Sequence, residues 1–386
     1  MKKVLVTGGA GFIGTEIVKQ LYGNGGETEI TVLDVMTEQI HGQDWKNSYL
    51  FKSIENSCRF VKADIRDLAA VKEAIGDNEF IIHLAAETGT GQSMYMINQY
   101  NEVNIMGTSN LIQAISDLRD KSRVKKIILA SSRSVYGEGK YSCPACGIVY
   151  PSSRKKENMQ GGDFNMHCDN CGQKISYEFT TEDSKIQPAS LYAFTKYAQE
   201  RLLETMCPAL GIDYTVFRFQ NVYGVGQSLK NPYTGILSIF STLMLENKSI
   251  NIFEDGLESR DFINVVDIAA AVIKSLEEPR SNSEVINLGS GVGTSVIEIA
   301  ELLKKIYDSK SEINITGDFR IGDIAHNIAD ISKAKKILEF EQSISLEQGL
   351  HEFCAWVKGQ SIDNSGYEKS LKEMEETGML VKGINS

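Results

Sequence analysis

Ser132, Tyr192 and Lys196 are the residues whose types and spacing best suit proton transfer. Tyr192 and Lys196 stand four residues apart in YAFTK, so on a helix they project from one face about one turn apart. A free tyrosine has a pKa of about 10 and is a poor base at neutral pH. A nearby ammonium favours the phenolate and brings that pKa toward the working range. Ser132 ends the apolar run VKKIILASS, where its hydroxyl could hold the group that loses its proton.

A glycine-rich turn in VLVTGGAGFIG points to a dinucleotide. Gly8 permits a sharp turn, Gly11 lets the backbone approach a pyrophosphate, and Gly14 lets the next helix pack against the strand. The turn follows a predicted strand and opens a predicted helix, and Asp34 closes the second strand 20 residues after Gly14. The Asp34 carboxylate would accept bonds from the adenosine ribose and repel a 2′-phosphate. The pattern therefore favours NAD over NADP.

Four of the seven cysteines form two CxxC pairs, CPACG and CDNCG, separated by 21 residues. Two such turns can supply four sulfurs to a tetrahedral zinc at about 2.3 Å. A redox role is the alternative, but neither pair opens a helix after a buried strand. We predict a structural zinc without a catalytic role, and we interpret the neighbouring His167 as a bystander. The predicted ligands are Cys143, Cys146, Cys168 and Cys171.

These groups must be positioned by a regular framework. The first 135 residues alternate buried apolar runs with stretches of helical spacing. This alternation predicts an α/β fold, a Rossmann-type doubly wound parallel sheet covered on both faces. The expected strands are KVLVTG, TEITVLD, CRFVKAD, EFIIHLAA and VKKIILASS, and the pattern resumes after residue 188 with the helix LYAFTKYAQERLLETM and the strand DYTVFRFQN.

Interruptions of this pattern suggest the domain organisation. We expect a smaller C-terminal substrate lobe with helices near 235–246, 295–307 and 345–357, and an exposed amphipathic helix in the tail, to which we assign no function. The expected units are a Rossmann domain at 1–138 and 184–224, an inserted four-cysteine zinc ribbon, or knuckle pair, at 139–183, a mainly substrate-binding lobe at 225–360 with some segments returning to the Rossmann domain, and a tail helix at 361–386.

The composition and charge of the chain limit the kinds of molecule that it is expected to bind. The net charge of −11 argues against a broad nucleic-acid surface, and we interpret the basic run at 154–156 as a solvated face. No apolar run reaches the roughly 18 residues of a membrane helix, and the N-terminus is too rich in glycine for a signal peptide. We therefore expect a cytoplasmic protein without a membrane partner. Its reducing surroundings favour metal binding over disulfides at the cysteine pairs.

The motifs together resemble the extended short-chain dehydrogenase/reductases, in the nucleotide-sugar epimerase and dehydratase group. The matching motifs follow the family order over about residues 1–357: TGGAGFIG, Asp64, HLAA (83–86), SSRSVYG (131–137), YAFTK, RFQNVYG (218–224), RDFINVVD (260–267) and FRIGD (319–323). The resemblance implies that Ser132, Tyr192 and Lys196 are the catalytic residues. It also implies a homodimer formed by the two long helices beside the active site.

The same resemblance implies the binding residues. Asn221, Arg260 and Arg320 fall where the family meets the phosphates of its substrate, a task that suits the planar arginine fork. The implied substrate contacts are Thr88, Ser132, Asn221, Arg260 and Arg320. The implied NAD contacts are Gly8, Gly11, Phe12, Ile13, Gly14, Asp34, Asp64, Ile65, Leu84, Ala85, Ala86, Tyr192 and Lys196, with Asp64 and Ile65 at the adenine.

One local difference from the dehydratases of the family favours another reaction. Dehydratases of this family usually carry Asp-Glu after the strand-end hydroxyl residue, whereas this chain has Arg133-Ser134. We therefore expect a 4-epimerase, in which hydride leaves C4, the 4-keto sugar rotates, and hydride returns to the opposite face while Tyr192 takes and returns the O4 proton.

Longer sequence segments resemble one subgroup of this family. ETGTGQSMY (87–95), SSRSVYGEG and the cysteine insert resemble proteins assigned as dTDP-L-rhamnose 4-epimerases. UDP-hexose 4-epimerase, a 4,6-dehydratase or 4-reductase, and a non-catalytic dinucleotide- or RNA-binding relative remain alternatives.

Overall fold

The computed structural model describes residues 1–23, 25–229, 235–360 and 365–383. Its centre is a seven-stranded sheet in which every neighbouring pair of strands is parallel. In spatial order the strands are β13 (Glu284–Leu288), β9 (Asp213–Phe219), β5 (Lys126–Ser132), β4 (Phe80–His83), β1 (Lys2–Thr7), β2 (Thr28–Asp34) and β3 (Arg59–Lys62). The chain order therefore reverses between β1 and β4, and such a switch point is where open α/β sheets bind ligands. The predicted fold class and all five early strands are confirmed.

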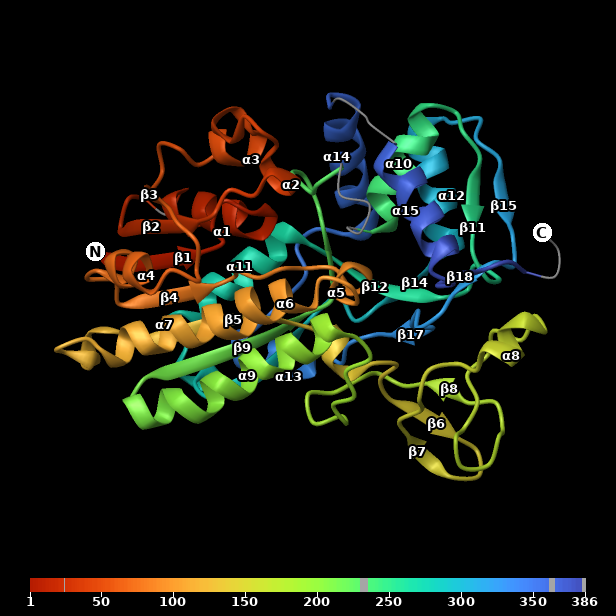
Figure 1. Cartoon of the computed structure of the whole chain (residues 1–386), viewed down its shortest axis with the longest axis horizontal. Coiled ribbons are helices and arrows are strands. Elements are labelled where there is room, and N and C mark those ends of the chain that lie inside the picture. Colours follow the sequence, from red (N-terminus) through yellow and green to blue (C-terminus); the bar gives the residue numbers. More distant parts are fainter. Residues whose placement is uncertain (24, 230–234, 361–364, 384–386) are drawn as a thin grey trace.

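Helices cover both faces of this sheet (Figure 1). One face packs on α1 (Phe12–Gly23) and α11 (Val265–Ser275), and the other on α4 (Leu68–Ile75), α7 (Gly107–Ser116) and α9 (Leu191–Leu210). Alternate residues of each strand enter the two cores, as Val4 and Leu5 of β1 do. Shorter helices complete the connections: α2 (Glu38–His41), η1 (Trp45–Asn47), α3 (Tyr49–Lys52), α5 (Thr90–Ser93), α6 (Ile97–Tyr100), η2 (Asn101–Met106), η3 (Lys121–Arg123), η4 (Arg133–Tyr136), η5 (Pro279–Ser281) and α13 (Ser332–Leu338).

A smaller lobe lies at one end of the sheet, with a separate apolar core. Its helices confirm the three predicted from sequence: α10 (Ile236–Leu245), α12 (Val296–Tyr307) and α14 (Leu346–Lys358). Residues 230–234, which the sequence assigns to this lobe, lie outside the described residues. Short strands form small sheets separate from the central one: β10 (Asn221–Tyr223), β11 (Ile250–Ile252), β12 (Ser259–Asn264), β14 (Gly293–Ser295), β15 (Ile313–Ile315), β16 (Phe319–Arg320) and β17 (His326–Asn327).

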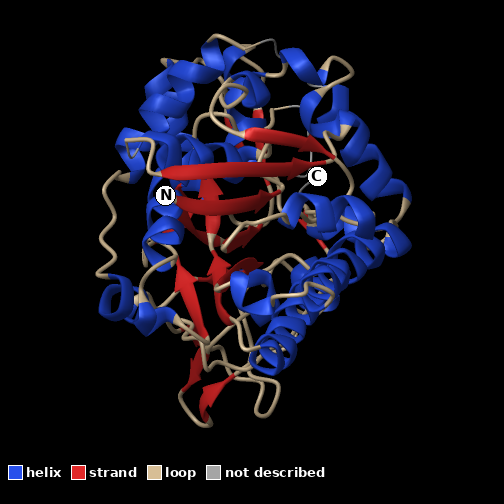
Figure 2. Ribbon diagram, turned by 90° about the vertical axis from the view of Figure 1, so that its left-hand side faces the viewer, coloured by secondary structure: helices blue, strands red, loops and turns tan. Residues whose placement is uncertain are grey.

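The insert after β5 forms a small three-stranded antiparallel sheet with a short helix. It projects from the body beside the C-terminal lobe, and Figure 2 shows its strands at the lower end of the molecule. Its own small core contains Cys143 and Cys168 together with Tyr141 and Ile175. Its elements are β6 (Tyr141–Cys143), β7 (Gly147–Val149), α8 (Lys156–Gln160) and β8 (Ser176–Tyr177).

The tail contains the predicted helix, α15 (Ser365–Glu376), followed by β18 (Leu380–Val381). Residues 361–364 of the predicted tail lie outside the described residues, as do 384–386. Among the described residues, no helix is both long and apolar enough to span a bilayer.

Candidate active site

The turn between β1 and α1 has the geometry that the glycine pattern predicted. Gly8 has a φ of +70°, in the left-handed region, and a Cβ there would lie 2.7 Å from Ala85 N. A Cβ on Gly14 would lie 2.5 Å from Gly8 O, so α1 begins directly against the loop. A Cβ on Gly11 would meet only Gly8 O, at 3.2 Å, so the outer side of the loop is open. The loop can therefore admit a pyrophosphate at the amino end of α1, where Phe12 begins the helix and backbone amides lack carbonyl partners.

Asp34 lies beside this loop at the carboxyl end of β2. Its buried carboxylate accepts hydrogen bonds from Ala10 N (3.1 Å) and Met36 N (2.9 Å). On the other side, Leu84 N donates to Thr7 O (3.0 Å), which brings the segment 84–86 against the glycine turn. The glycine turn, Asp34 and this segment therefore lie together at the switch point of the sheet. These residues fit a dinucleotide, because the cradle stays open only while Gly8 and Gly14 lack a Cβ.

The three predicted catalytic residues meet at the carboxyl end of β5. Ser132 is the last residue of that strand, and its side chain lies close enough to Tyr192 to affect the pKa of the phenol. Ser132 Oγ also accepts a bond from Ser134 N (3.2 Å), which fixes its position at the start of η4. Lys196 follows one turn later on α9, and its buried Nζ donates to Ala130 O of β5 (2.9 Å). The packing of α9 on β5 thus assembles residues that lie 60 positions apart in the chain.

The charges around the phenol differ from the expectation. Burial raises the pKa of Tyr192, and the Ser132 hydrogen bond and the positive charge of Arg133 act in the opposite direction. The sequence predicted that Lys196 would have this effect. Burial lowers the pKa of Lys196 itself to about 7, despite the opposing charge of Glu200, so Lys196 is only partly charged at neutral pH. Arg133 supplies the positive charge that opposes the rise in the pKa of Tyr192.

Arg133 reaches into the site beside Ser132. Its Nε donates to Asn221 Oδ1 (2.8 Å) at the start of β10. Its Nη1 is buried and has no hydrogen-bond partner among the described residues. Burial and the positive charge of Arg260 lower the pKa of Arg133 to about 10, so the guanidinium stays charged at neutral pH. Sequence reasoning used Arg133 only as the residue that stands where a dehydratase has an acid, and missed this placement.

Arg260 and Arg320, both predicted at the phosphates, converge on Asp323. Arg320 Nη2 donates to Asp323 Oδ2 (2.7 Å), and Arg260 Nη2 lies 3.4 Å from Asp323 Oδ1. Arg260 Nη1 also donates to Ala325 O (3.1 Å). Burial raises the pKa of Asp323, but the charges of Arg320, Arg260 and Arg154 outweigh it and hold the pKa at about 2. Asp323 therefore fixes both guanidinium groups. The sequence analysis had named it only as the last residue of the motif FRIGD.

The C-terminal tail is attached to the strand that carries Arg320. β18 pairs antiparallel with β16, with Arg320 opposite Leu380, and Ile321 N donates to Met379 O (2.9 Å). Burial raises the pKa of Tyr367 on α15, and the charge of Arg320 opposes this rise, so the two side chains lie close together. The tail helix is mostly exposed, as predicted, but it is anchored beside a predicted substrate residue.

The four paired cysteines come together in the insert. Their sulfur atoms all lie within 4.8 Å of one another, and Cys143 and Cys171 are 3.5 Å apart. Sulfurs around a tetrahedral zinc at about 2.3 Å would be about 3.8 Å apart, which matches this spacing. His167 is not part of the cluster, because its ring nitrogens pair with Asp163 Oδ2 (2.7 Å) and Gly172 O (3.1 Å). The cysteines therefore form a candidate metal site of four thiolates.

The insert docks on the chain's own C-terminal lobe. Arg154 forms a bidentate ion pair with Glu254, in which Nη2 lies 2.9 Å from Oε1, and it also donates to Asp323 O (3.0 Å). The interpretation of 154–156 as a solvated face was wrong for Arg154, whose side chain is only 3% exposed. The buried carboxylate of Glu254 explains the difference, since a buried charge requires a partner. The cysteine core also packs on Ala325, whose carbonyl holds Arg260.

The remaining predicted contacts have mixed surroundings. Asp64 lies just after β3, and its carboxylate is paired with Arg66 at 2.7 Å. Ile65 is buried against α7, where a Cβ on Gly107 would lie 2.6 Å from its side chain. The Thr88 carbonyl accepts a hydrogen bond from the Tyr100 hydroxyl (2.6 Å). These residues lie in loops at the carboxyl edge of the sheet, but their side chains do not by themselves point to a ligand.

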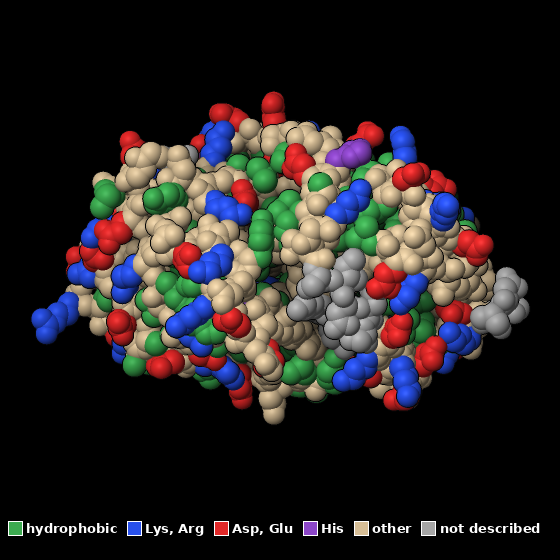
Figure 3. All heavy atoms as spheres, turned by 90° about the horizontal axis from the view of Figure 1, so that it is seen from above, with side chains coloured by type: hydrophobic (Ala, Val, Ile, Leu, Met, Phe, Trp, Pro, Cys, Tyr) green, Lys and Arg blue, Asp and Glu red, His purple; other side chains and the backbone are tan. Residues whose placement is uncertain are grey.

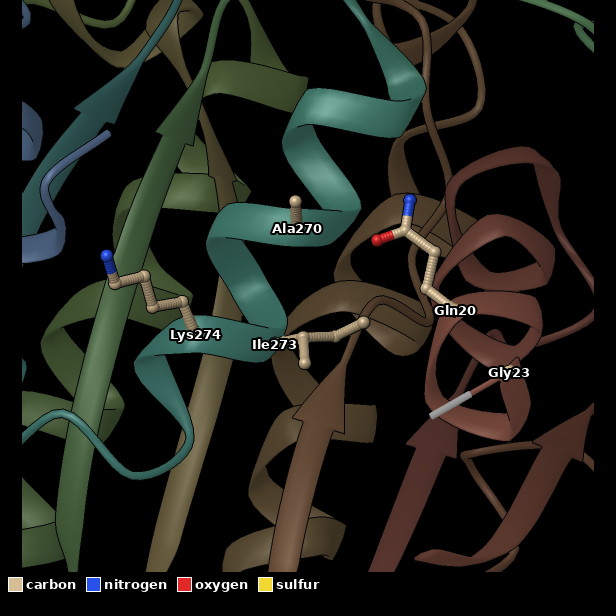
Figure 4. Close-up of a pocket in the computed structure, with 5 residues that line it drawn as sticks. All are labelled: Gln20, Gly23, Ala270, Ile273 and Lys274. Carbon is tan, nitrogen blue, oxygen red and sulfur yellow. The ribbon is translucent and has the colours of Figure 1, made fainter. Parts of the chain in front are cut away.

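A shallow hollow of about 510 Å³ lies elsewhere, between α1 and α11 (Figure 4). It is lined by Gln20, Gly23, Ala270, Ile273 and Lys274. Gln20 there donates to Val266 O (3.1 Å), a contact that joins the two helices. The hollow has none of the predicted site residues, and we assign it no chemistry.

Comparison with known proteins agrees with this geometry. The model of the NAD dependent epimerase/dehydratase family matches residues 4–154 and 169–289. A dTDP-L-rhamnose 4-epimerase of Burkholderia thailandensis is 36% identical over 94% of this chain and 96% of its own length. The chain belongs to the NAD-dependent epimerase/dehydratase family. The family-model match leaves out residues 155–168, within the insert, so the family framework surrounds this segment.

Solved structures of family members share the whole architecture. UDP-glucose 4-epimerase of Thermotoga maritima, solved with UDP-glucose, has a TM-score of 0.73 and 28% identity, covering 92% of this chain and 99% of its own. UDP-glucuronic acid 4-epimerase of Bacillus cereus, solved with UDP-glucuronic acid and NAD, has a TM-score of 0.74 and 25% identity over the same shares. The family resemblance inferred from the motifs is therefore confirmed over nearly the full chain.

Proposed function

We propose that this family member is an NAD-dependent nucleotide-sugar 4-epimerase. The observation that carries the proposal is the approach of Ser132, Tyr192 and Lys196 at the end of β5, on the same edge of the sheet as a glycine turn that fits a dinucleotide. This arrangement can hold a sugar hydroxyl and remove its proton beside a redox cofactor. Relatives with 4-epimerase names and solved complexes with nucleotide sugars support the same reading.

Each residue of the site has a definite task in this proposal. Ser132 holds the O4 hydroxyl of the sugar, and Tyr192 takes its proton and later returns it. Lys196, held by Ala130 O, would contact the nicotinamide ribose, while the charge of Arg133 favours the phenolate of Tyr192. NAD, when bound, would supply a temporary acceptor for the hydrogen on C4. Epimerisation needs no further acid, because the proton that leaves O4 is the proton that returns.

The proposed NAD site comprises the glycine turn and the residues beside it. Gly8, Gly11, Phe12, Ile13 and Gly14 would face the pyrophosphate, and Asp34 the adenosine ribose, while Asp64, Ile65 and the segment 84–86 would line the remaining cofactor surface. The substrate residues of the proposal are Thr88, Ser132, Asn221, Arg260 and Arg320. The two arginines, held by Asp323, would grip the pyrophosphate of the nucleotide sugar.

A dehydratase or reductase is the weaker alternative. Elimination of water needs a proton donor beside the leaving hydroxyl, and Arg133-Ser134 supplies a cation and an alcohol there instead of two acids. Net reduction would favour NADPH, whose 2′-phosphate would meet the Asp34 carboxylate. The sugar is proposed as dTDP-L-rhamnose from the relative in Burkholderia thailandensis, with a UDP-hexose as the second choice from the structure solved with UDP-glucose.

We further propose that the four cysteines hold one structural zinc. Four thiolates at this spacing suit a tetrahedral ion and leave no open position for substrate or water. The metal would fix the insert, which packs on the segment that supports Arg260. The domain boundaries at 138/139 and 183/184 follow from this proposal, with the lobe and tail divided near 224/225 and 360/361.

A homodimer is also part of the proposal. Large apolar side chains are exposed along the edge formed by α6, η2 and the start of α9, and a surface of this kind is unusual on a monomer. They are Met94, Tyr95, Ile97, Met106 and Phe194. A cytoplasmic location fits seven unpaired cysteines in the described chain, since thiols persist in a reducing compartment.

A protein that only binds dinucleotide or RNA is the rival from another functional class. On the face shown in Figure 3, acidic and basic side chains intermingle and form no single basic patch. The intact Ser132–Tyr192 contact also has no purpose in a binding-only relative. A filter-binding assay at two salt concentrations would reveal nucleic-acid affinity through its salt dependence.

The decisive experiment incubates the protein with dTDP-L-rhamnose, UDP-glucose and UDP-glucuronic acid and follows C4 configuration by NMR. We expect inversion at C4 without net consumption of NAD. A 4-keto-6-deoxy product would instead indicate a dehydratase, and no change in any sugar, with NAD bound, would contradict the proposal.

A further inference from the structure

Arg133 is a strongly charged group in the candidate site to which neither the family motifs nor the proposed mechanism assigns a ligand. Its Nε is held by Asn221, so the position of the guanidinium is set by β10 as well as by β5. Its Nη1 is buried and has no hydrogen-bond partner among the described residues. A buried guanidinium nitrogen without a partner is costly, because the desolvation of a charged donor is not offset. This end of the side chain therefore suits an anion brought by a ligand.

The neighbouring charges indicate where that anion would sit. Arg260 is near enough to contribute to the lowered pKa of Arg133 by like-charge repulsion, and the charge of Arg133 opposes the rise that burial causes in the pKa of Tyr192. The nearby carboxylates are engaged elsewhere: Asp323 by two arginines, Asp261 by Ser290 and backbone amides, and Glu138 by Ala325 N. Arg133 thus lies near both the Tyr192 phenol and Arg260, and no carboxylate in the described part of the chain forms an ion pair with it.

We propose that Arg133 is a third phosphate-binding arginine, which contacts the phosphate that carries the sugar. This inference rests on the proposed nucleotide-sugar substrate. A phosphate between Arg133 and Arg260 would relieve the repulsion between two guanidinium groups and give Nη1 its missing acceptor. In a nucleoside diphosphate sugar, the phosphate next to the sugar is the one nearest the reacting carbon. Arg133 is therefore placed for this phosphate, whereas Arg260 and Arg320 also face the phosphate next to the nucleoside.

The inference also gives Arg133 a role in orienting the sugar. Arg133 directly follows Ser132, which would hold O4, so one short segment would contact both ends of the hexose phosphate. When the keto sugar turns over, the phosphate must stay in place while the ring rotates. A cation fixed by Asn221 provides that pivot.

The test compares ligands with and without this phosphate. UDP and dTDP contain it, whereas UMP and dTMP lack it, so calorimetric titration of the NAD-loaded protein isolates the contact. We expect Arg133→Met to weaken diphosphate binding about 10-fold to 100-fold, the range for one hydrogen bond to a charged group, and to leave monophosphate binding unchanged. Arg133→Lys should fall between the two, because it keeps the charge but loses the planar fork.

Arg280→Met is the matched control, because Arg280 is 52% exposed and its partners, Glu278, Glu339 and Lys336 O, lie outside the candidate site. Equal losses for monophosphate and diphosphate would overturn the inference, since they would show a general disturbance of the site. Unchanged diphosphate binding together with a shifted pH profile of turnover would also overturn it and would confine Arg133 to the Tyr192 phenol. If the wild-type chain binds none of the four nucleotides, the proposed function itself fails.

Discussion

Replacing Arg154 by methionine tests how the insert is joined to the substrate lobe. The side chains of Arg154 and Glu254 are 3% and 1% exposed, and the guanidinium also donates to Asp323 O. Removing one partner of a buried pair leaves an uncompensated buried charge, which typically costs about 3–5 kcal/mol. We expect Arg154→Met to loosen the contact between insert and lobe by that amount at neutral pH.

The loss of stability caused by Arg154→Met should depend on pH in a defined direction. Burial raises the pKa of Glu254, and Arg154 opposes this rise. In the variant the opposing charge is gone, so the pKa in the folded state lies further above its unfolded value. A carboxyl group whose pKa is higher in the folded state stabilises the fold at pH values below its unfolded pKa. This stabilisation is lost as the pH rises through the folded pKa. The defect of Arg154→Met relative to wild type should therefore be smallest near about pH 5 and grow toward about pH 8.

Hydrogen exchange of peptides from 139–183 measures this local opening. A loss of about 3 kcal/mol corresponds to opening that is roughly 10²-fold more frequent. The control is the double variant Arg154→Met, Glu254→Met, which removes both charges and should recover most of the protection, because an apolar pair of similar volume is often as stable. Unchanged protection in the single variant, or a double variant as weak as the single one at every pH, would refute this reasoning.

Four further outcomes are expected. Tyr192→Phe should lower turnover by about 10²–10⁴-fold with bound NAD unchanged, measured by NMR and absorbance; loss of NAD would instead make Tyr192 an anchor for the cofactor. Cys143→Ser should reduce zinc from about one ion per chain in metal analysis, and full retention of zinc would contradict the four-thiolate site. Asp34→Ser should raise the affinity for NADP relative to the affinity for NAD, measured by competitive titration. An unchanged ratio of the two affinities would show that residues outside β2 discriminate between the cofactors. Deleting 365–386 should raise KM more than it changes kcat, because β18 supports the strand of Arg320; an unchanged KM would leave the tail without this role.

Short-range patterns explain why much of the site was predictable. The glycine spacing forces one backbone path, because a Cβ on Gly8 or Gly14 would lie within 3 Å of neighbouring backbone atoms. The four-residue spacing of Tyr192 and Lys196 places both on one face of α9. The two CxxC turns likewise bring their thiols together within each pair. Each of these features depends on residues close in the sequence, so local geometry was sufficient.

Other features depend on contacts between distant segments, and the sequence left them open or wrong. Arg154 reads as part of a basic run, and only the approach of Glu254, 100 residues later, makes it a buried ion pair. Lys196 was expected to act on the Tyr192 phenol; burial lowers the pKa of Lys196 to about 7, and the sequence left open that the charge of Arg133 also acts on the phenol.

The sequence by itself determined the fold class, the cofactor-type turn and the residue types available for chemistry, because these follow from hydrophobic periodicity and local backbone constraints. The tertiary structure decided which charges meet. Asp323 holds Arg260 and Arg320, and the insert supports that cluster through Arg154. Arg133 has a buried Nη1 that finds no hydrogen-bond partner in the part of the chain that the structure describes. Burial and distance set the strength of each of these interactions, and both arise only when segments far apart in the chain pack together.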